Sequence, residues 1–167
     1  DWKDNDGWLD TNISVCKWHG ITCNGDALVG EIELRDNNVD CQIPADLFYL
    51  SHLDQLDLSG NHDVTIDFSS LDVDRTAPLT KLFFADANID SLKGLDLLFA
   101  ESLTALGAAG NRINGDFPQQ ILALSSLQLL DLGYNFLSGE IPDDLTRLTN
   151  LKKLFLSHNL FTGPIPS

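Results

Sequence analysis

The sequence contains no apolar run long enough to cross a membrane. Its longest apolar stretch, around Leu95 to Ala100, is interrupted by Asp96 and followed by Glu101, whereas a spanning helix needs about 20 apolar residues. No leader peptide is visible, because the chain opens directly on Asp1-Trp2-Lys3-Asp4, as a processed secreted protein would. We therefore expect one domain of 167 residues that does not itself span a membrane.

Glutamate and basic residues are scarce. The chain has 25 acidic residues, mostly Asp, against 10 Lys and Arg, so its formal net charge is −15, and residues 1–74 hold 16 of the acids. Asp favours turns and caps whereas Glu favours helix interiors, which predicts a turn-rich, helix-poor chain. The charge argues against nucleic acid as a partner. Two interpretations of the negative charge stay open. It can serve solubility or suit a saline environment, or it can attract a cationic partner or weakly held cations.

The sequence also lacks a catalytic or metal-binding constellation. Its four histidines show no metal-ligand spacing, its paired serines stand at turns without a nucleophile-elbow context, and its aspartate pairs show no sign of a shared pocket. The acidic stretch 63–75 lacks the ligand spacing of an EF-type calcium loop. We therefore predict no enzymatic activity, no cofactor and no metal site.

Cysteine is present in an odd number. With three cysteines, Cys16, Cys23 and Cys41, the default expectation is one disulfide and one buried free thiol. Any disulfide implies an oxidising compartment.

A repeat runs through most of the chain. Pairs of apolar residues separated by one residue begin at positions 32, 56, 82, 106, 130 and 154. Such a pair places two side chains on one face of a short strand. One strand per unit stacks into a parallel sheet, and neighbouring units bury each other's leucines because no single unit can bury its own. The period predicts an α/β-type solenoid of about six coils, most of 24 residues.

An asparagine follows five of the six strands, three residues after the second apolar site. These residues are Asn37, Asn61, Asn111, Asn135 and Asn159. A side-chain amide at this place can satisfy backbone groups inside the turn, where water cannot reach. In the third unit, Ala87 stands at the position that asparagine occupies in the other five. We therefore expect the turn after Phe84 to satisfy its backbone through Asn88 or water, and to be more mobile than the turns of coils four to six.

The regular units continue with Gly-x-Ile/Phe-Pro, as at Gly115–Pro118, Gly139–Pro142 and Gly163–Pro166. Gly permits a tight bend and Pro stiffens the chain that leaves it. The complete unit, L-x-x-L-x-x-L-x-L-x-x-N-x-L-x-G-x-I-P, resembles the plant-type leucine-rich repeat of receptor-kinase ectodomains, receptor-like proteins and polygalacturonase-inhibiting proteins. This resemblance covers residues 28–167. It implies a right-handed superhelix with its parallel sheet on the concave face.

The segment from Cys16 to Cys23, CKWHGITC, is similar to the C-x-W-x-G-V-x-C element of the same family's N-terminal cap. The resemblance implies a Cys16–Cys23 disulfide and an extracellular or cell-surface location. We expect residues 1–27 to form this cap and residues 28–167 to form the solenoid, without a C-terminal cap. Asn12 lies in the single glycosylation sequon, Asn12-Ile-Ser14, and is a candidate glycan carrier.

The chain departs from the family pattern in three places. Cys41 replaces the first Gly of Gly-x-Ile-Pro, which predicts a small buried residue with a free thiol. The 63–75 segment lengthens one coil; we expect Val64, Ile66 and Phe68 to point inward and the loop to be able to carry partner contacts. The chain ends after a regular repeat, so we expect a truncated ectodomain that continues with repeats, a transmembrane segment or both, or an end covered by another surface.

The outward positions of the strands are the candidate binding surface. Coils one and two are acidic, coil four is nearly bare, and apolar and aromatic residues border it. The candidate contact residues are Glu33, Asp57, Phe83, Gly107, Leu129, Asp131, Tyr134 and Phe155. Exposed aromatic residues around a shallow depression are typical of an interface anchor. The alternative is a neutral surface with scattered apolar residues.

The resemblance implies a recognition ectodomain of a cell-surface receptor, or a fragment of one, that binds a protein or peptide ligand on its concave face. The acidity of the first coils would favour a basic ligand. Two alternatives remain: a secreted inhibitor similar to polygalacturonase-inhibiting proteins, and an acidic adhesive or cell-wall protein.

Overall fold

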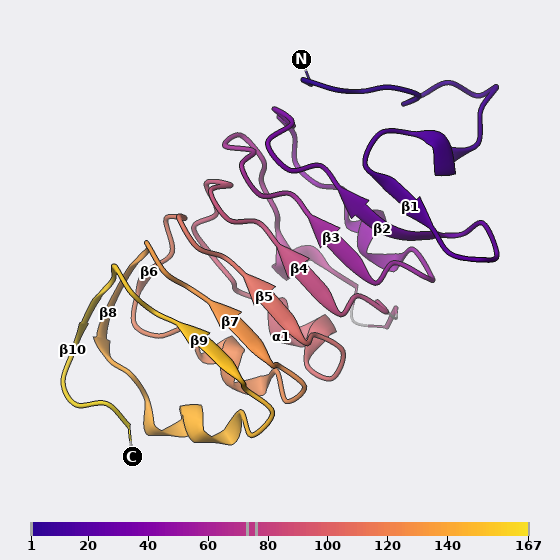
Figure 1. Cartoon of the computed structure of the whole chain (residues 1–167). Coiled ribbons are helices and arrows are strands. Elements are labelled where there is room, and N and C mark those ends of the chain that lie inside the picture. The colour runs from indigo at the N-terminus through magenta and orange to yellow at the C-terminus, as the bar shows by residue number, and fades with distance from the viewer. Residues whose placement is uncertain (1, 73, 76, 167) are drawn as a thin grey trace.

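Each repeat contributes one short strand to a single sheet. The computed structural model describes residues 2–72, 74–75 and 77–166. The parallel strands, in their order across the sheet, are β2 (Val29–Glu33), β3 (Gln55–Asp57), β4 (Lys81–Phe83), β5 (Ala105–Gly107), β7 (Leu129–Asp131) and β9 (Lys153–Phe155). The predicted parallel sheet is confirmed, and Figure 1 shows its strands stacked from the N-terminal to the C-terminal end.

The strand register reproduces the period of the sequence. Ile32 pairs with Leu56, Leu56 with Leu82, and the same position continues through the later strands. Because successive side chains of a strand point to opposite faces, this register places every first leucine on the inner face. From coil one to coil five these residues are at most 3% exposed. The sheet thus keeps the outward positions of each coil in register as well.

An N-terminal hairpin adds a seventh strand. The 3-10 helix η1 (Val15–Lys17) precedes β1 (Ile21–Cys23), which pairs antiparallel with β2. The ring centroids of Trp2 and Trp8 lie 4.8 Å apart, and those of Trp8 and Trp18 lie 5.1 Å apart. Since Trp2 and Trp8 also pack against the core, the indole cluster supplies apolar cover beside the first coil.

The segments that return from one strand to the next lie on the opposite side of the stack (Figure 1). They contain the short 3-10 helices η2 (Ala45–Tyr49), η3 (Phe68–Ser70), η4 (Gln119–Ala123) and η5 (Asp143–Arg147), and the short α-helix α1 (Leu95–Phe99). A second parallel sheet has the order β10-β8-β6, formed by Leu160–Thr162, Phe136–Glu140 and Asn114–Gly115. The helices are few and short, as the predominance of aspartate over glutamate predicted.

The asparagines form a ladder inside the turns. The Oδ1 atom of Asn61 accepts the amide hydrogens of Asn37 and Val39 on the preceding coil, at 3.0 and 2.9 Å. Its Nδ2 atom donates to three carbonyl oxygens, at Leu34, Leu58 and Ser59. Asn61 is 0% exposed, so these bonds replace the hydration of buried backbone groups. Each ladder residue therefore joins its own coil to the preceding one.

Ala87 removes one step of this ladder, but not at the place that the sequence suggested. Asn111, on coil four, accepts the amide hydrogens of Ala87 and Ile89 and donates to Phe84 O. The coil-three turn is thus satisfied by Asn111 and not by Asn88. Because ladder residues reach backwards, the missing step lies between coils two and three. Between these coils Ala85 N donates instead to Ser59 Oγ, at 3.1 Å.

Phenylalanine rings fill the inside of the lengthened coil. Val64 and Phe68 are buried, as predicted, whereas Ile66 is only half-buried. The ring centroids of Phe68 and Phe84 lie 6.0 Å apart, within the range of a favourable aromatic pair. At the far end of the segment, Arg75 pairs with Asp46 at 2.7 Å. The 63–75 segment is therefore tied to the stack at both ends.

Candidate binding face

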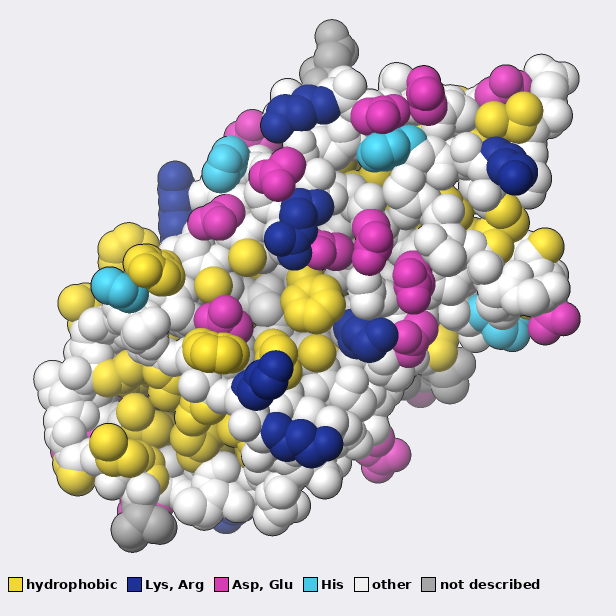
Figure 2. Space-filling view, in the orientation of Figure 1, with side chains coloured by type: hydrophobic (Ala, Val, Ile, Leu, Met, Phe, Trp, Pro, Cys, Tyr) yellow, Lys and Arg dark blue, Asp and Glu magenta, His cyan; other side chains and the backbone are white. Residues whose placement is uncertain are grey.

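The outward-pointing residues of the six coils form one continuous surface, which we call the sheet face. It comprises the residues between the buried apolar positions, from just before each strand to the turn after it, and Figure 2 looks onto it. Its charged and aromatic members are Glu31, Glu33, Arg35, Asp36, Asp54, Asp57, Lys81, Phe83, Asp86, Asp131, Tyr134, Lys152, Lys153, Phe155 and His158. Strand β5 contributes only alanine and glycine to this face.

Asp57 is buried, so its predicted exposure on the outer surface is wrong. It is 7% exposed, and Arg35 of the preceding coil donates to its Oδ2 through Nη2 at 2.9 Å and Nε at 3.3 Å. Asp57 Oδ1 accepts the amide hydrogen of Ser59 at 2.9 Å. The hydrogen bond to Asp57 raises the pKa of Arg35. Because the longer side chain of Arg35 covers Asp57, the carboxylate is not accessible and the two charges largely neutralise each other.

Glu33, by contrast, is exposed as predicted. Its Oε1 accepts a hydrogen bond from Gln55 Nε2 at 2.6 Å, which leaves the second carboxylate oxygen facing outward. The acidic end of the sheet face thus presents Glu33 and Asp36 to solvent, with Glu31 half-buried beside them.

The bare fourth coil does not form the expected open depression. A Cβ atom placed on Gly107 would lie 2.6 Å from Cδ1 of Phe83, so the ring of Phe83 lies over the glycine. Gly107 is buried and Phe83 half-buried. The absence of a side chain on β5 lets the neighbouring ring lie flat, which fills the space that the sequence left empty. The result is an apolar floor, with Gly107 buried beneath the ring of Phe83.

Coils five and six bring the remaining predicted residues together. Strand pairing sets Asp131 beside Phe155, and Gly107 on the other side of Asp131. Leu129 and Asp131 are half-buried, and Asp131 Oδ1 accepts the amide hydrogen of Gly133 at 3.0 Å. Phe155 is 48% exposed. This exposed ring is therefore the most accessible aromatic group on the strands of the sheet face.

The turn residue before each ladder position has a left-handed backbone. The φ angles run from 52° to 74° at Asp36, Gly60, Asp86, Gly110, Tyr134 and His158. Tyr134 and His158 adopt a conformation that bulky residues rarely take, next to buried Asn135 and half-buried Asn159. Their rings stack at 4.1 Å with an angle of 14°, and Tyr134 is 61% exposed. The predicted exposure of Tyr134 is confirmed.

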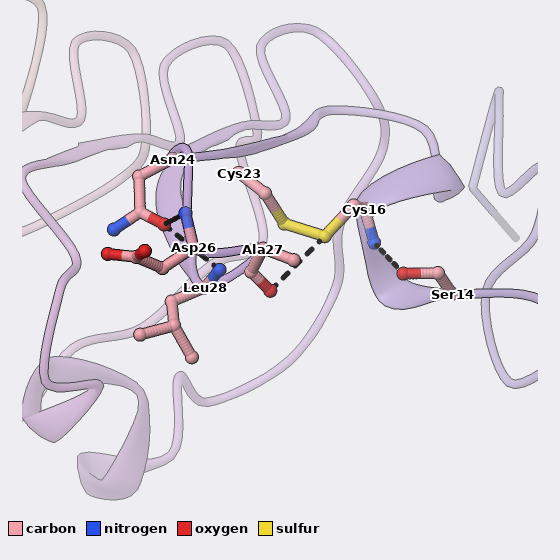
Figure 3. Close-up of a disulfide and its surroundings, with 7 residues drawn as sticks. All are labelled: Ser14, Cys16, Cys23, Asn24, Asp26, Ala27 and Leu28. Atoms are coloured by element: carbon pink, nitrogen blue, oxygen red, sulfur yellow. Dashed lines mark hydrogen bonds between the residues drawn. A yellow bond between two sulfur atoms is a disulfide. The ribbon is translucent and has the colours of Figure 1, made fainter.

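The cap contains the expected disulfide. Cys16 and Cys23 are bonded to each other, which joins η1 to β1 (Figure 3). In the adjoining turn Asn24 Oδ1 accepts the amide hydrogens of Asp26 and Leu28, at 3.0 and 3.1 Å. The bond and this turn hold the hairpin against the first coil. Asn12 is exposed, and its occupation by a glycan stays a prediction.

Cys41 differs from the prediction in one respect. It is a free thiol, as expected, but it is exposed and not buried. The glycine position that Cys41 occupies lies at the surface. The equivalent residues of two other coils, Gly115 and Gly163, are exposed too. Partial desolvation by the protein, followed by the charge of Asp40, raises the pKa of this thiol.

Among residues 2–72, 74–75 and 77–166, no cluster of three His, Cys, Asp or Glu side chains is arranged to hold a metal ion. Within the same ranges, no helix is both long and apolar enough to cross a membrane.

Sequence reasoning missed two features of the sheet face. The pairing of Arg35 with Asp57 was not predicted. Arg35 stands on the preceding coil, two residues after the position that is equivalent to Asp57. Lys152 and Lys153 were not among the predicted contact residues, because the net negative charge of the chain indicated only a basic ligand. A count of charges coil by coil would have found both.

Comparison with known proteins agrees with this architecture. The family model described as Leucine rich repeat matches residues 101–161. Over these residues the chain is similar to leucine-rich-repeat proteins. Two Arabidopsis thaliana relatives support the plant type: a probable leucine-rich repeat receptor-like protein kinase, 36% identical over 58 residues, and Receptor-like protein 36, 44% identical over 48 residues. These segments are 35% and 29% of this chain and 6% of each relative.

A solved structure extends the similarity to nearly the whole chain. It is the ectodomain of the Arabidopsis thaliana membrane receptor kinase GASSHO1/SCHENGEN3, in complex with CASPARIAN STRIP INTEGRITY FACTOR 2. The TM-score is 0.77 at 28% identity, over 98% of this chain and 20% of that one. The present chain thus spans about a fifth of that ectodomain. The predicted resemblance to plant receptor ectodomains is confirmed.

Proposed function

We propose that this leucine-rich-repeat chain is a non-catalytic recognition module that binds a peptide or protein ligand on the sheet face. The carrying observation is the set of aromatic rings presented there. Phe155 and Tyr134 are 48% and 61% exposed, and Phe83 forms an apolar floor on β4, separated from Phe155 by β5 and β7. Aromatic residues on a rigid scaffold anchor ligands well, because burying them removes much apolar surface from water at little entropic cost.

The relatives support the same proposal. The GASSHO1/SCHENGEN3 ectodomain is in complex with CASPARIAN STRIP INTEGRITY FACTOR 2, and both curated relatives are receptor-like proteins. We propose accordingly that this chain is an ectodomain, or a part of one, of a cell-surface receptor. The proposal includes a right-handed superhelix of about six coils over residues 28–167, a cap over residues 1–27 and a concave sheet face.

The proposed location is extracellular or at the cell surface. The Cys16–Cys23 bond supports it, because structural disulfides persist in oxidising compartments. Of the contact residues first considered, Glu33, Phe83, Leu129, Asp131, Tyr134 and Phe155 stay in the proposed site. Asp57 and Gly107 are covered by Arg35 and Phe83, and these two covering side chains would meet the ligand in their place.

The test uses peptides selected on the protein itself. A phage-displayed random dodecapeptide library is panned on the folded chain, and enriched peptides are measured against Phe155→Ser. We expect this change to weaken them about tenfold or more, as the loss of an anchor residue does.

The matched control is Leu97→Ser. Leu97 is 56% exposed but lies on α1, behind the sheet, so its loss should leave affinity unchanged. The proposal is overturned if no peptide is enriched, or if Leu97→Ser weakens the enriched peptides while Phe155→Ser does not.

A further inference from the structure

Charge is segregated along the sheet face. Coils one and two carry Glu31, Glu33, Asp36, Asp54 and Asp57 against the single base Arg35, a formal charge of −4. Coil three balances Lys81 against Asp86, and coil four has no charge on this face. Coil five carries Asp131, and coil six carries Lys152 and Lys153 and no carboxylate, so one acid against two bases gives these two coils together a formal charge of +1 on this face. In Figure 2 the acidic side chains gather over the N-terminal strands.

Internal pairs reduce the acidic excess of the first two coils but do not remove it. Arg35 is bound to Asp57 at 2.9 Å and Lys81 to Asp54 at 3.4 Å, so these four groups largely neutralise one another. The exposed groups left on the first coil are Glu33 and Asp36, which face outward.

The sixth coil keeps its positive charge. Lys152 Nζ donates to Gln128 Oε1 at 2.9 Å, a neutral partner that leaves the charge uncompensated. Lys153 is exposed, and within the described part of the chain it has no ion pair. Phe155 stands on the same strand. Coil six thus places two cations beside the exposed aromatic anchor.

The distance between coil one and coil six determines which charged groups of the protein interact with each end of a bound ligand. Five strand spacings separate coils one and six, about 24 Å. The Debye length is about 8 Å at physiological salt, so each end of a bound segment interacts with its own coil and hardly with the other. The net charge of the whole chain therefore does not prevent an acidic group from binding at coil six. The carboxylate within reach there is Asp131 on the adjacent strand, and the two lysines outnumber it. An extended peptide spans about 24 Å with roughly seven residues.

We infer that the sheet face takes an extended peptide with segregated charges. Its basic part lies over coils one and two, its apolar centre on Phe83 and Phe155, and its acidic part beside Lys152 and Lys153. The inference rests on the proposed function and adds the charge pattern and orientation of the ligand.

The experiment compares synthetic peptides of one composition. The block peptide is Lys-Lys-Arg-Gly-Phe-Ala-Leu-Gly-Glu-Glu-Glu, made in both chain directions; the control keeps the Phe-Ala-Leu centre and alternates the charges. At about 150 mM salt, we expect one block peptide to bind about tenfold more tightly than the alternating peptide, since several local pairs of modest strength add up.

A charge reversal tests the orientation. Lys152→Glu with Lys153→Glu should weaken the block peptide about tenfold and leave the alternating peptide nearly unchanged. The matched control, Lys17→Glu with Lys93→Glu, changes the net charge equally at exposed residues outside the sheet face. A paramagnetic label on the glutamate end should broaden the amide signals of coil six and not those of coil one.

The outcomes separate this inference from the proposed function. Equal binding of block and alternating peptides, both weakened by Phe155→Ser, overturns the charge pattern and leaves the function standing. Equal weakening by the control reversal also overturns it, because the effect would then come from net charge. If no peptide binds, or if Phe155→Ser has no effect on those that do, the inference falls together with the proposed site.

Discussion

Asn61 shows how much a single side chain holds together in this fold. One amide accepts two hydrogen bonds from the preceding coil and donates three to carbonyl oxygens. We expect Asn61→Ala to lower the free energy of unfolding by about 3 kcal/mol, because several buried backbone groups lose their partner at once. Urea denaturation followed by circular dichroism measures this.

The control for Asn61 is Asn114→Ala. Asn114 is exposed, and its Nδ2 makes one hydrogen bond of 3.2 Å, to Arg112 O. Its loss should change stability by less than about 0.5 kcal/mol, as for most surface positions. Equal effects of the two substitutions would show that the buried amide ladder does not stabilise the turns.

The thiol of Cys41 permits a second prediction at the same scale. Desolvation first, and then the charge of Asp40, raise its pKa, so less of the reactive thiolate is present at neutral pH than in a free cysteine. We expect iodoacetamide to modify Cys41 without denaturant, more slowly than it modifies a cysteine peptide at pH 7, and faster as the pH rises through the raised pKa. Mass spectrometry measures the rates, with Cys41→Ser as the blank. A rate at or above that of the peptide would contradict the raised pKa.

Removing the disulfide should destabilise the N-terminal hairpin and leave the distant strands unaffected. The Cys16–Cys23 bond has a sequence separation of 7, and the loop-entropy relation assigns such a short loop about 2.5 kcal/mol. Because coils of a solenoid contact only their neighbours, Cys16→Ser with Cys23→Ser should lower hydrogen-exchange protection in η1, β1 and β2 and leave β5, β7 and β9 unchanged. A uniform loss of protection along the whole stack would contradict this local effect.

The elements also show which features the sequence could predict. The strands and their register follow from apolar spacing, since a shift by one residue would turn every leucine outward. The missing ladder step was predicted from Ala87 but placed one coil too late, because the spacing does not reveal whether Asn reaches forward or backward. Burial on the outer face was also misjudged at Asp57 and Gly107, since it depends on where the long side chains of Arg35 and Phe83 lie.

For the whole molecule, repulsion among its carboxylates is the governing long-range term. The formal net charge is −15, and like charges destabilise a compact chain until salt screens them. We expect the Tm to rise by a few degrees between about 20 mM and about 500 mM NaCl. Calorimetry gives the Tm, and sucrose at matched osmolality controls for effects other than screening. A Tm that falls steadily with salt would show that attractive ion pairs outweigh the repulsion.

The junction between coils two and three, which we call the seam, is where the asparagine ladder lacks a step, and this has a mechanical consequence. In the described part of the chain, no ladder amide and no pair of the second sheet joins these two coils, while backbone bonds such as Leu58 N to Phe83 O remain. Force applied along the stack concentrates where fewest bonds share the load. A molecule stretched from its ends should therefore tear first at this seam, into a short piece that carries the cap and a longer piece that carries the aromatic anchor.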